Sequence, residues 1–238
     1  MSEDDFLSRW EPFQEVLVFE LLRRGKEITL LSRLVPTPRA AGLVLARMAS
    51  SNDRSVREGA AALAGLLSES APLDVLAALF ARETSPPPID PLTAFAAQEN
   101  VRALVFSAAR WCRSDRARDA GLALCRDVVE RTIAGGAKEH WTASPFAMST
   151  LVRHRPEEHR ALLDRFAAWA NGDPPAYLVP TTLQSERSCA RALLAGNENA
   201  LRRVDALIDK KDAEGMVAVP ARMRESLERL LALASELG

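Results

Sequence analysis

The sequence predicts an all-helical protein, because its residue types, its helix-end signals and its apolar spacing all favour helices. Among its 238 residues are 40 Ala and 33 Leu, which are good helix formers. Aromatic residues, which favour strands, make up only 5% of the chain. No segment alternates polar and apolar residues over enough positions to predict a strand. With 47% hydrophobic residues, the chain is too apolar for a disordered protein and long enough to bury a large core.

Capping residues indicate where many of the helices begin and end. Ser2 lies three residues before Asp5, and Ser55 lies three residues before Glu58, as in a capping box. Three side chains that can cap a helix stand directly before a proline, which suits the first helical turn: Thr37, Asp90 and Ser144. Five glycines follow helical runs and suit a left-handed position at the helix end: Gly25, Gly135, Gly172, Gly196 and Gly215.

Between these signals, apolar residues recur at helical spacing. Val56, Ala60, Leu63 and Leu67 share one face, and residues 223–237 carry a long apolar stripe. We expect that last stripe to cap the core, with a dimer seam as the alternative. In chain order, the predicted helices span residues 3–24 (with a break allowed at Pro12), 27–35, 38–50, 55–69, 72–83, 91–98, 100–112, 116–134, 145–154, 157–171, 186–195, 198–213 and 220–237.

Short connections between these helices predict one all-helical domain over residues 1–238. Proline gathers at residues 84–90, and this stiff connection is the place where a sub-boundary is expected. Two further long connections, residues 135–144 and 172–185, are candidate functional loops or simple spacers.

Residues 53–67 resemble the second helix of a HEAT repeat. The matching positions are Asp53, Val56, Arg57, Ala60, Ala61 and Leu66. Residues 114–129 form a second copy, which has Ala117 where the family usually has Val; its matching positions are Asp115, Arg118, Gly121 and Leu124. A weaker echo occurs at Val101 and Arg102, and the three copies give no strict period. The resemblance implies a HEAT-like superhelix of antiparallel helix pairs, and the alternative is an irregular multi-helix bundle.

The cysteines and the N-terminus bear on the compartment. Cys112, Cys125 and Cys189 form no CxxC pair, and their odd number does not resemble a disulfide framework. The acidic start of the chain lacks the apolar segment of a signal peptide. No apolar run approaches the roughly 20 residues that span a bilayer. We therefore expect a cytoplasmic protein with no membrane association.

Motifs for catalysis, cofactors and metals are missing from the sequence. It contains no nucleophile elbow and no glycine-rich phosphate loop. Its histidines, His140, His154 and His159, lack metal-ligand spacing and are expected at the surface or as caps. The sequence accordingly predicts no catalytic residue, no cofactor and no metal, and an enzyme with an unrecognised site remains an alternative.

A non-catalytic protein-protein interaction module or adaptor is the leading functional prediction, because helix-pair stacks present an extended surface. One specific form is a bacterial immunity-type protein that binds a single partner. Interfaces favour Trp, Tyr and Arg, which gives these candidate partner-binding residues: Trp111, Arg113, Arg118, Trp141, Trp169 and Tyr177. For Trp111 the more common role is that of a core filler.

Nucleic-acid binding is the alternative from another class. Small HEAT-like proteins include a family of alkylpurine DNA glycosylases of similar length, which use a cationic groove with aromatic residues and a carboxylate near the lesion. This sequence contains none of their motifs. Here Trp111 stands among four arginines: Arg110, Arg113, Arg116 and Arg118. Asp115 and Asp119 interrupt this cluster, and the net charge of the chain is −1. The sequence therefore does not favour this alternative, and it leaves the oligomeric state open.

Overall fold

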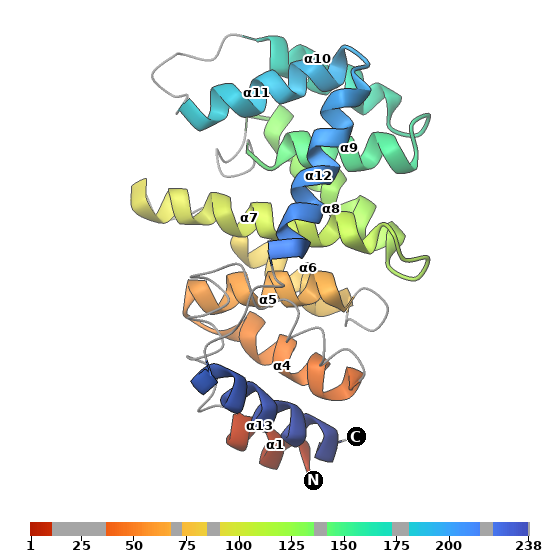
Figure 1. The fold of residues 1–238 in the computed structure, drawn as a ribbon. Coiled ribbons are helices and arrows are strands. Elements are labelled where there is room, and N and C mark those ends of the chain that lie inside the picture. Colours follow the sequence, from red (N-terminus) through yellow and green to blue (C-terminus); the bar gives the residue numbers. More distant parts are fainter. Residues whose placement is uncertain are drawn as a thin grey trace. The chain divides into compact units, whose positions relative to one another are not determined.

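A computed structural model of the chain describes residues 1–10, 37–67, 73–84, 91–135, 142–172, 181–214 and 221–237. Every regular element in these ranges is a helix, which confirms the predicted all-α class (Figure 1). The chain forms two compact units, residues 1–79 with 209–238 and residues 80–208. The boundaries between them fall within the helices α6 (Leu73–Glu83) and α12 (Glu198–Glu214). Most of the expected sub-boundary at 84–90 lies outside the described residues and stays a prediction.

Unit 1 contains both ends of the chain. Its helices are α1 (Glu3–Trp10), α4 (Pro38–Ser50), α5 (Arg54–Leu66) and α13 (Ala221–Leu237). Figure 1 shows α13 beside α1, and both helices also pack against α4. The core of this unit includes the fully buried Phe6, Trp10, Leu45, Met48 and Leu63. Leu230, Leu233, Ala234 and Leu237 of α13 are buried as well, so the last apolar stripe closes the core of unit 1.

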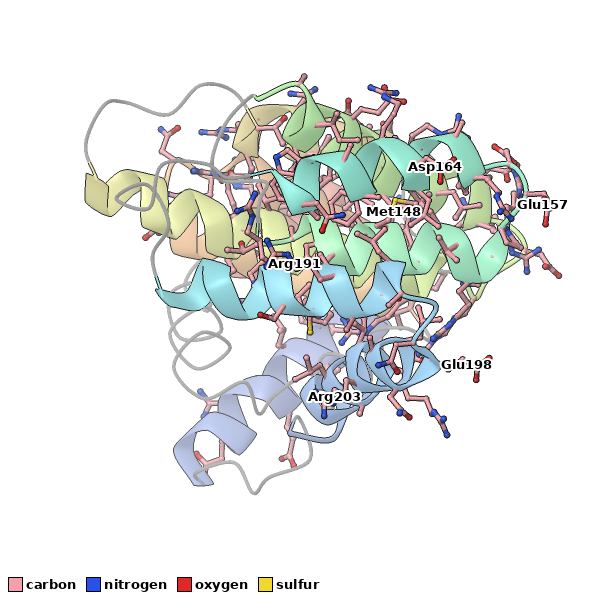
Figure 2. All side chains as sticks on the ribbon, turned by 90° about the horizontal axis from the view of Figure 1, so that it is seen from above. Met148, Glu157, Asp164, Arg191, Glu198 and Arg203 are labelled. Atoms are coloured by element: carbon pink, nitrogen blue, oxygen red, sulfur yellow. The ribbon has the colours of Figure 1, made fainter. Side chains whose placement is uncertain are left out.

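Unit 2 contains most of the features discussed below. Its helices are α7 (Pro91–Trp111), α8 (Arg118–Ile133), α9 (Ser144–His154), α10 (Arg160–Asn171), α11 (Thr181–Leu194) and most of α12. Helix α8 packs against α7, α9 and α10, and α11 packs against α9 and α10. Figure 2 shows Met148 among the helices and Glu157 at the outer end of the turn that joins α9 to α10. The interior includes the fully buried Leu104, Trp111, Cys125, Met148 and Phe166.

Gly121 allows α7 and α8 to approach closely. A Cβ atom at this position would lie 2.6 Å from the carbonyl oxygen of Ala108 and 2.9 Å from Sγ of Cys112. A contact this short with backbone requires a shift of the helix, so any larger residue would separate the two helices. The glycine that matches the second HEAT-like copy is thus a packing residue.

Several predicted caps are confirmed. Ser2 Oγ accepts a hydrogen bond from the backbone N–H of Asp5 at 3.1 Å. Gly135 and Gly196 have φ angles of 71° and 70°, the left-handed conformation expected for them at helix ends.

Three predicted caps are wrong. Gly172 ends α10 with a φ of −63°, so its position does not require glycine. Thr37 precedes α4 without a side-chain cap bond. Ser144 is the first residue of α9 rather than its cap, which is Ala143. The caps expected at Gly25, Asp90 and Gly215 lie outside the described residues, and the side chain of Ser55 is also not described.

Some helix boundaries differ from the predicted ones. The helices predicted at 91–98 and 100–112 are a single helix, α7, because no Gly or Pro interrupts the chain there. The side chain of Asn100 instead donates a buried hydrogen bond from Nδ2 to Oε2 of Glu83 at 2.7 Å. Helices α8 and α10 begin later than predicted, at Arg118 and Arg160, because the preceding residues form turns. Helix α11 begins earlier, at Thr181. Residues 11–36, which include most of the helix predicted at 3–24 and the one at 27–35, are outside the described ranges.

All three cysteines are free thiols, which agrees with the prediction of no disulfide framework. Cys112 and Cys125 are fully buried, whereas Cys189 is partly exposed. Burial raises the pKa of Cys112 to about 12 and raises that of Cys125 well above its ordinary value. Within the described ranges, no helix is long and apolar enough to cross a membrane.

Candidate functional site

The predicted partner-binding residues fall in different environments. Trp111 has 0% exposure and belongs to the core of unit 2, the role that is more common for such a residue. Arg113 is exposed and Arg118 is partly exposed. Trp141 and Tyr177 lie outside the described residues. In this fold, Trp111 therefore cannot present its ring to a partner or to a base.

Trp169 is partly exposed, but it is engaged by its own chain. Its ring stacks on Phe166, with 5.3 Å between the centroids. The guanidinium of Arg187 lies 5.4 Å from the Trp169 ring centroid, in a cation-π arrangement. Arg187 also donates hydrogen bonds to the carbonyl oxygens of Trp169 and Gly172, at 3.2 Å and 2.8 Å. Trp169 thus connects α10 to α11.

Two turns meet at one end of unit 2, and arginines lie in or directly beside both of them. The first joins α7 to α8 (residues 112–117), and the second joins α9 to α10 (residues 155–159). An ion pair between Arg155 and Asp119 holds the second turn to the start of α8. We call residues 109–119 and 152–160 the arginine end, because they contain seven arginines and only four acidic residues.

A small pocket opens at the arginine end, where the end of α7 lies near α9 and α12. Its volume is about 30 Å³. Because one water molecule needs about 10–15 Å³ in such a cavity, the pocket has room for roughly two oxygen atoms. Metabolite sites are typically about 300–1,000 Å³. We call it the His154 pocket; it is lined by the apolar Ala109 and Val204 and by the polar residues Arg113, Ser149, Thr150, Arg153, His154 and Asp205.

Positive charge exceeds negative charge around His154. Its pKa is lowered, first by burial and then by Arg118, Arg153 and Arg113. Asp205 raises this pKa, but its effect is the smallest of those acting on the imidazole. Asp205 is itself paired with Arg153. The imidazole of His154 therefore sits in a positive potential that disfavours its protonation.

The two hydroxyl groups of the pocket differ in what they can donate. Thr150 Oγ1 donates its proton to the carbonyl oxygen of Phe146 at 2.9 Å, within α9. Its remaining capacity is as an acceptor. Ser149, with 2% exposure, supplies a neutral donor. The polar groups that can donate to a ligand are therefore mainly the arginines, His154 and Ser149.

A second histidine at the arginine end, His159, belongs to a balanced charge cluster. Arg126 Nη2 lies 2.5 Å from Oε1 of Glu158 and 3.4 Å from Nδ1 of His159. Arg155 Nη1 donates to Oε2 of Glu158 at 3.3 Å. The carboxylates of Glu158 and Asp119 thus face the two arginines of this cluster.

His159 was expected at the surface or as a cap, and its burial corrects that expectation. It occupies the position before α10, but its side chain makes no cap bond and has only 1% exposure. Its Nε2 atom is buried without a hydrogen-bond partner. Burial, followed by Arg126, lowers the pKa of His159.

Sequence analysis predicted part of this site. Arg113 and Arg118 were selected from the local arginine cluster, but Arg153, His154 and Asp205 were not. They come from α9 and α12, and no short motif joins residues so far apart in the chain. Within the described residues, no group of three His, Cys, Asp or Glu side chains is placed to hold a metal ion.

Comparisons with protein-family models, with curated proteins and with solved structures give no match to this chain. The functional assignment therefore depends on the geometry and charge of the His154 pocket and the two turns beside it.

Proposed function

We propose that this chain is a non-catalytic protein-binding module that contacts an acidic segment of a partner protein through the arginine end of unit 2. The observation that carries the proposal is the His154 pocket, which is cationic and has room for one small group. A ligand bound at this pocket can place only one small group inside it, so the rest of the ligand must lie on the surface around the pocket. That arrangement fits a macromolecular partner better than a metabolite.

Surface arginines beside the pocket support this proposal. Arg113 and Arg116 are exposed on the turn between α7 and α8, and the Arg118 side chain has 38% exposure. A guanidinium group can bind a carboxylate through two parallel hydrogen bonds, and arginine is enriched at protein interfaces. The helices on either side hold these side chains on a packed framework.

We further propose a HEAT-like stack of helix pairs as the framework. The two arginines of the HEAT-like copies both bind near the start of their own helix. Arg118 Nη2 lies 2.6 Å from Oδ1 of Asp115, and Arg57 Nη1 donates to the carbonyl oxygens of Ser51 and Asn52. Each arginine thus stabilises the turn that precedes its helix. The three free thiols support a reducing compartment such as the cytoplasm.

The alternatives have less support. Base stacking by Trp111 requires an exposed ring, and Trp111 is buried. The Asp115 side chain, with 94% exposure, also places negative charge among the arginines that would meet phosphates. An enzyme acting through His154 would need space for a substrate, and this pocket accommodates only about two oxygen atoms.

Site-specific photo-crosslinking tests the proposed function. A photoreactive amino acid replaces Arg116 at the arginine end or, as a control, Asp164, which is exposed on α10 (Figure 2). Each variant is illuminated in a lysate of the source cells, with and without prior nuclease treatment. We expect one protein to be crosslinked from position 116 and not from position 164. Crosslinks that disappear with nuclease, or the same proteins captured from both positions, would contradict the proposal.

A further inference from the structure

We infer that the His154 pocket is a carboxylate-binding site, which takes a single carboxylate group from the protein partner. The inference rests on the proposed function and adds the chemistry of the contact. It follows from three properties of the pocket, namely its charge, its size and its buried walls. An Asp or Glu side chain, or a C-terminal carboxylate, would supply the group.

The charges of the pocket favour an anion. Arg113 and Arg153 line it together with His154, and among the described residues Asp205 is the one acidic side chain in its lining. Arg118 lies close enough to act on the same imidazole. Arg153 already forms an ion pair with the carboxylate of Asp205, so an arginine that lines the pocket can bind this type of group. Because a guanidinium group has five N–H donors, these arginines can donate to a second carboxylate in addition to the contacts that they already make.

The size of the pocket selects among anions. About 30 Å³ accommodates roughly two water-sized atoms. A carboxylate has two oxygen atoms on one carbon, whereas a phosphate group has four around phosphorus. The pocket therefore accommodates both oxygen atoms of a carboxylate, whereas a phosphate group would keep part of its oxygen atoms outside it.

Buried walls strengthen the interaction. Ser149, Thr150 and Val204 have exposures of 2%, 7% and 4%, and Ala109 is also buried. Charges that face such a wall are less screened by water than charges on an open surface. Because Arg113 and Arg153 are themselves exposed to solvent, the buried wall reduces screening on only one side of an ion pair formed with them.

Carboxylate binding at this place also responds to pH. The charged groups that act on His154 are Arg118 and Arg113 at the end of α7 and start of α8, Arg153 on α9 and Asp205 on α12. A bound carboxylate stabilises the protonated imidazole, so the pKa of His154 is higher in the complex than in the free protein. By linkage, affinity increases as pH decreases through the pKa of the complex.

The first test titrates the full chain with sodium acetate, sodium phosphate or sodium chloride at constant ionic strength. Proton–carbon correlation NMR spectra follow the ring signals of the three histidines during each titration. The signal that is missing from the spectrum of His154→Gln is assigned to His154. We expect acetate to move the His154 signal saturably and to raise its pKa, with a weaker effect of phosphate. Equal responses to chloride, or equal movement of the three histidines, would overturn the inference.

Variants locate the acetate site. Arg113→Gln is expected to weaken acetate binding by up to about fivefold, because it removes a charged donor that lines the pocket but is exposed to solvent. Arg165→Gln is the matched control, since Arg165 is an exposed arginine of α10 outside the pocket. Unchanged acetate affinity in Arg113→Gln, or an equal loss in Arg165→Gln, would overturn the assignment.

The photo-crosslinking experiment separates this inference from the proposed function. If acetate binds but Arg113→Gln leaves the crosslinked partner unchanged, the partner does not supply the carboxylate and the inference fails. If crosslinking from position 116 fails while acetate binds, the proposed function fails and the pocket remains a site for small carboxylates. If acetate does not bind while crosslinking succeeds, only the inference is overturned.

Discussion

His154 and His159 lie five residues apart at the same end of unit 2, both near arginines, yet their surroundings differ. Around His154, three arginines act on the imidazole and the one opposing carboxylate, Asp205, has the smallest effect. Around His159, Arg126 and Arg155 are matched by Glu158 and Asp119. His154 lines a pocket, whereas His159 is buried.

The difference shows that the number of arginines does not by itself define a binding site. In the cluster around His159, the carboxylates of the chain already occupy the arginines, so a ligand would have to displace an existing ion pair. In the His154 pocket, positive charge remains in excess beside a small cavity. The location of the acidic residues therefore decides where a group of arginines leaves a net positive potential.

The largest expected effect comes from truncating the buried side chain of Trp111, which precedes the turn between α7 and α8. Trp111→Ala should reduce the free energy of unfolding by about 3–5 kcal/mol, because a fully buried ring is lost. Trp169→Ala should cost only about 1–2 kcal/mol, because that ring is partly exposed and loses one stacked pair and one cation-π contact. Urea unfolding followed by circular dichroism measures both. Similar losses in the two variants would contradict the assignment of Trp111 to the core.

The next effect concerns the close contact between α7 and α8 at Gly121. Gly121→Ala should reduce the free energy of unfolding by about 1–3 kcal/mol, since the new Cβ atom would lie 2.6 Å from a backbone oxygen. Gly42→Ala is the matched control, because Gly42 is also inside a helix and has no atom within 4 Å of its Cβ position. That substitution should stabilise the protein by about 0.5–1 kcal/mol. Thermal and urea unfolding of both variants test the pair, and a stabilised Gly121→Ala would refute the close packing.

A smaller effect distinguishes the two histidines by the pH dependence of stability. The pKa of His159 in the folded protein is below its ordinary value of 6.5, so the unfolded chain binds the proton more readily. Stability therefore decreases as pH falls below about 6.5 and stops decreasing below the folded pKa. His159→Gln should reduce this decrease between pH 7.5 and 5, and His154→Gln should reduce it less because His154 is partly exposed. Unfolding at several pH values measures the slopes, and an identical slope in wild type and His159→Gln would be inconsistent with the buried, neutral imidazole.

The smallest effect is expected for an arginine that is already paired. Arg155→Gln removes exposed ion pairs to Asp119 and Glu158, so it should change the midpoint of thermal unfolding only slightly. Acetate binding at the His154 pocket should also stay within about twofold of the wild type, because Arg155 does not line the pocket. A large loss of acetate binding in Arg155→Gln would show that the two regions are coupled.

Local patterns in the sequence were sufficient for the helical class and for several helix ends. Apolar spacing and capping residues depend on neighbours within a few positions, so Ser2, Gly135 and Gly196 were assigned correctly. Helix α7 was wrongly divided near residue 99, although no Gly or Pro interrupts it there. The buried hydrogen bond from Asn100 to Glu83, by contrast, cannot be recognised from local sequence.

The candidate site was only partly predictable for the same physical reason. Arg113 and Arg118 were visible as a local charge cluster, but whether each arginine is matched by a carboxylate depends on packing between helices. Asp205, which pairs with Arg153, is more than 50 residues away from it in the sequence. Which arginines lie beside a carboxylate can therefore be read only from the packed structure, not from the sequence.

The three free thiols allow local unfolding of unit 2 to be measured by chemical labelling. Alkylating reagents react with thiolates, and burial with a raised pKa protects Cys112 and Cys125 in the folded state. Cys189 is partly exposed and serves as an internal reference for reagent access. The rate at which Cys112 and Cys125 become labelled thus measures how often unit 2 opens between α7, α8 and α9, without any engineered probe.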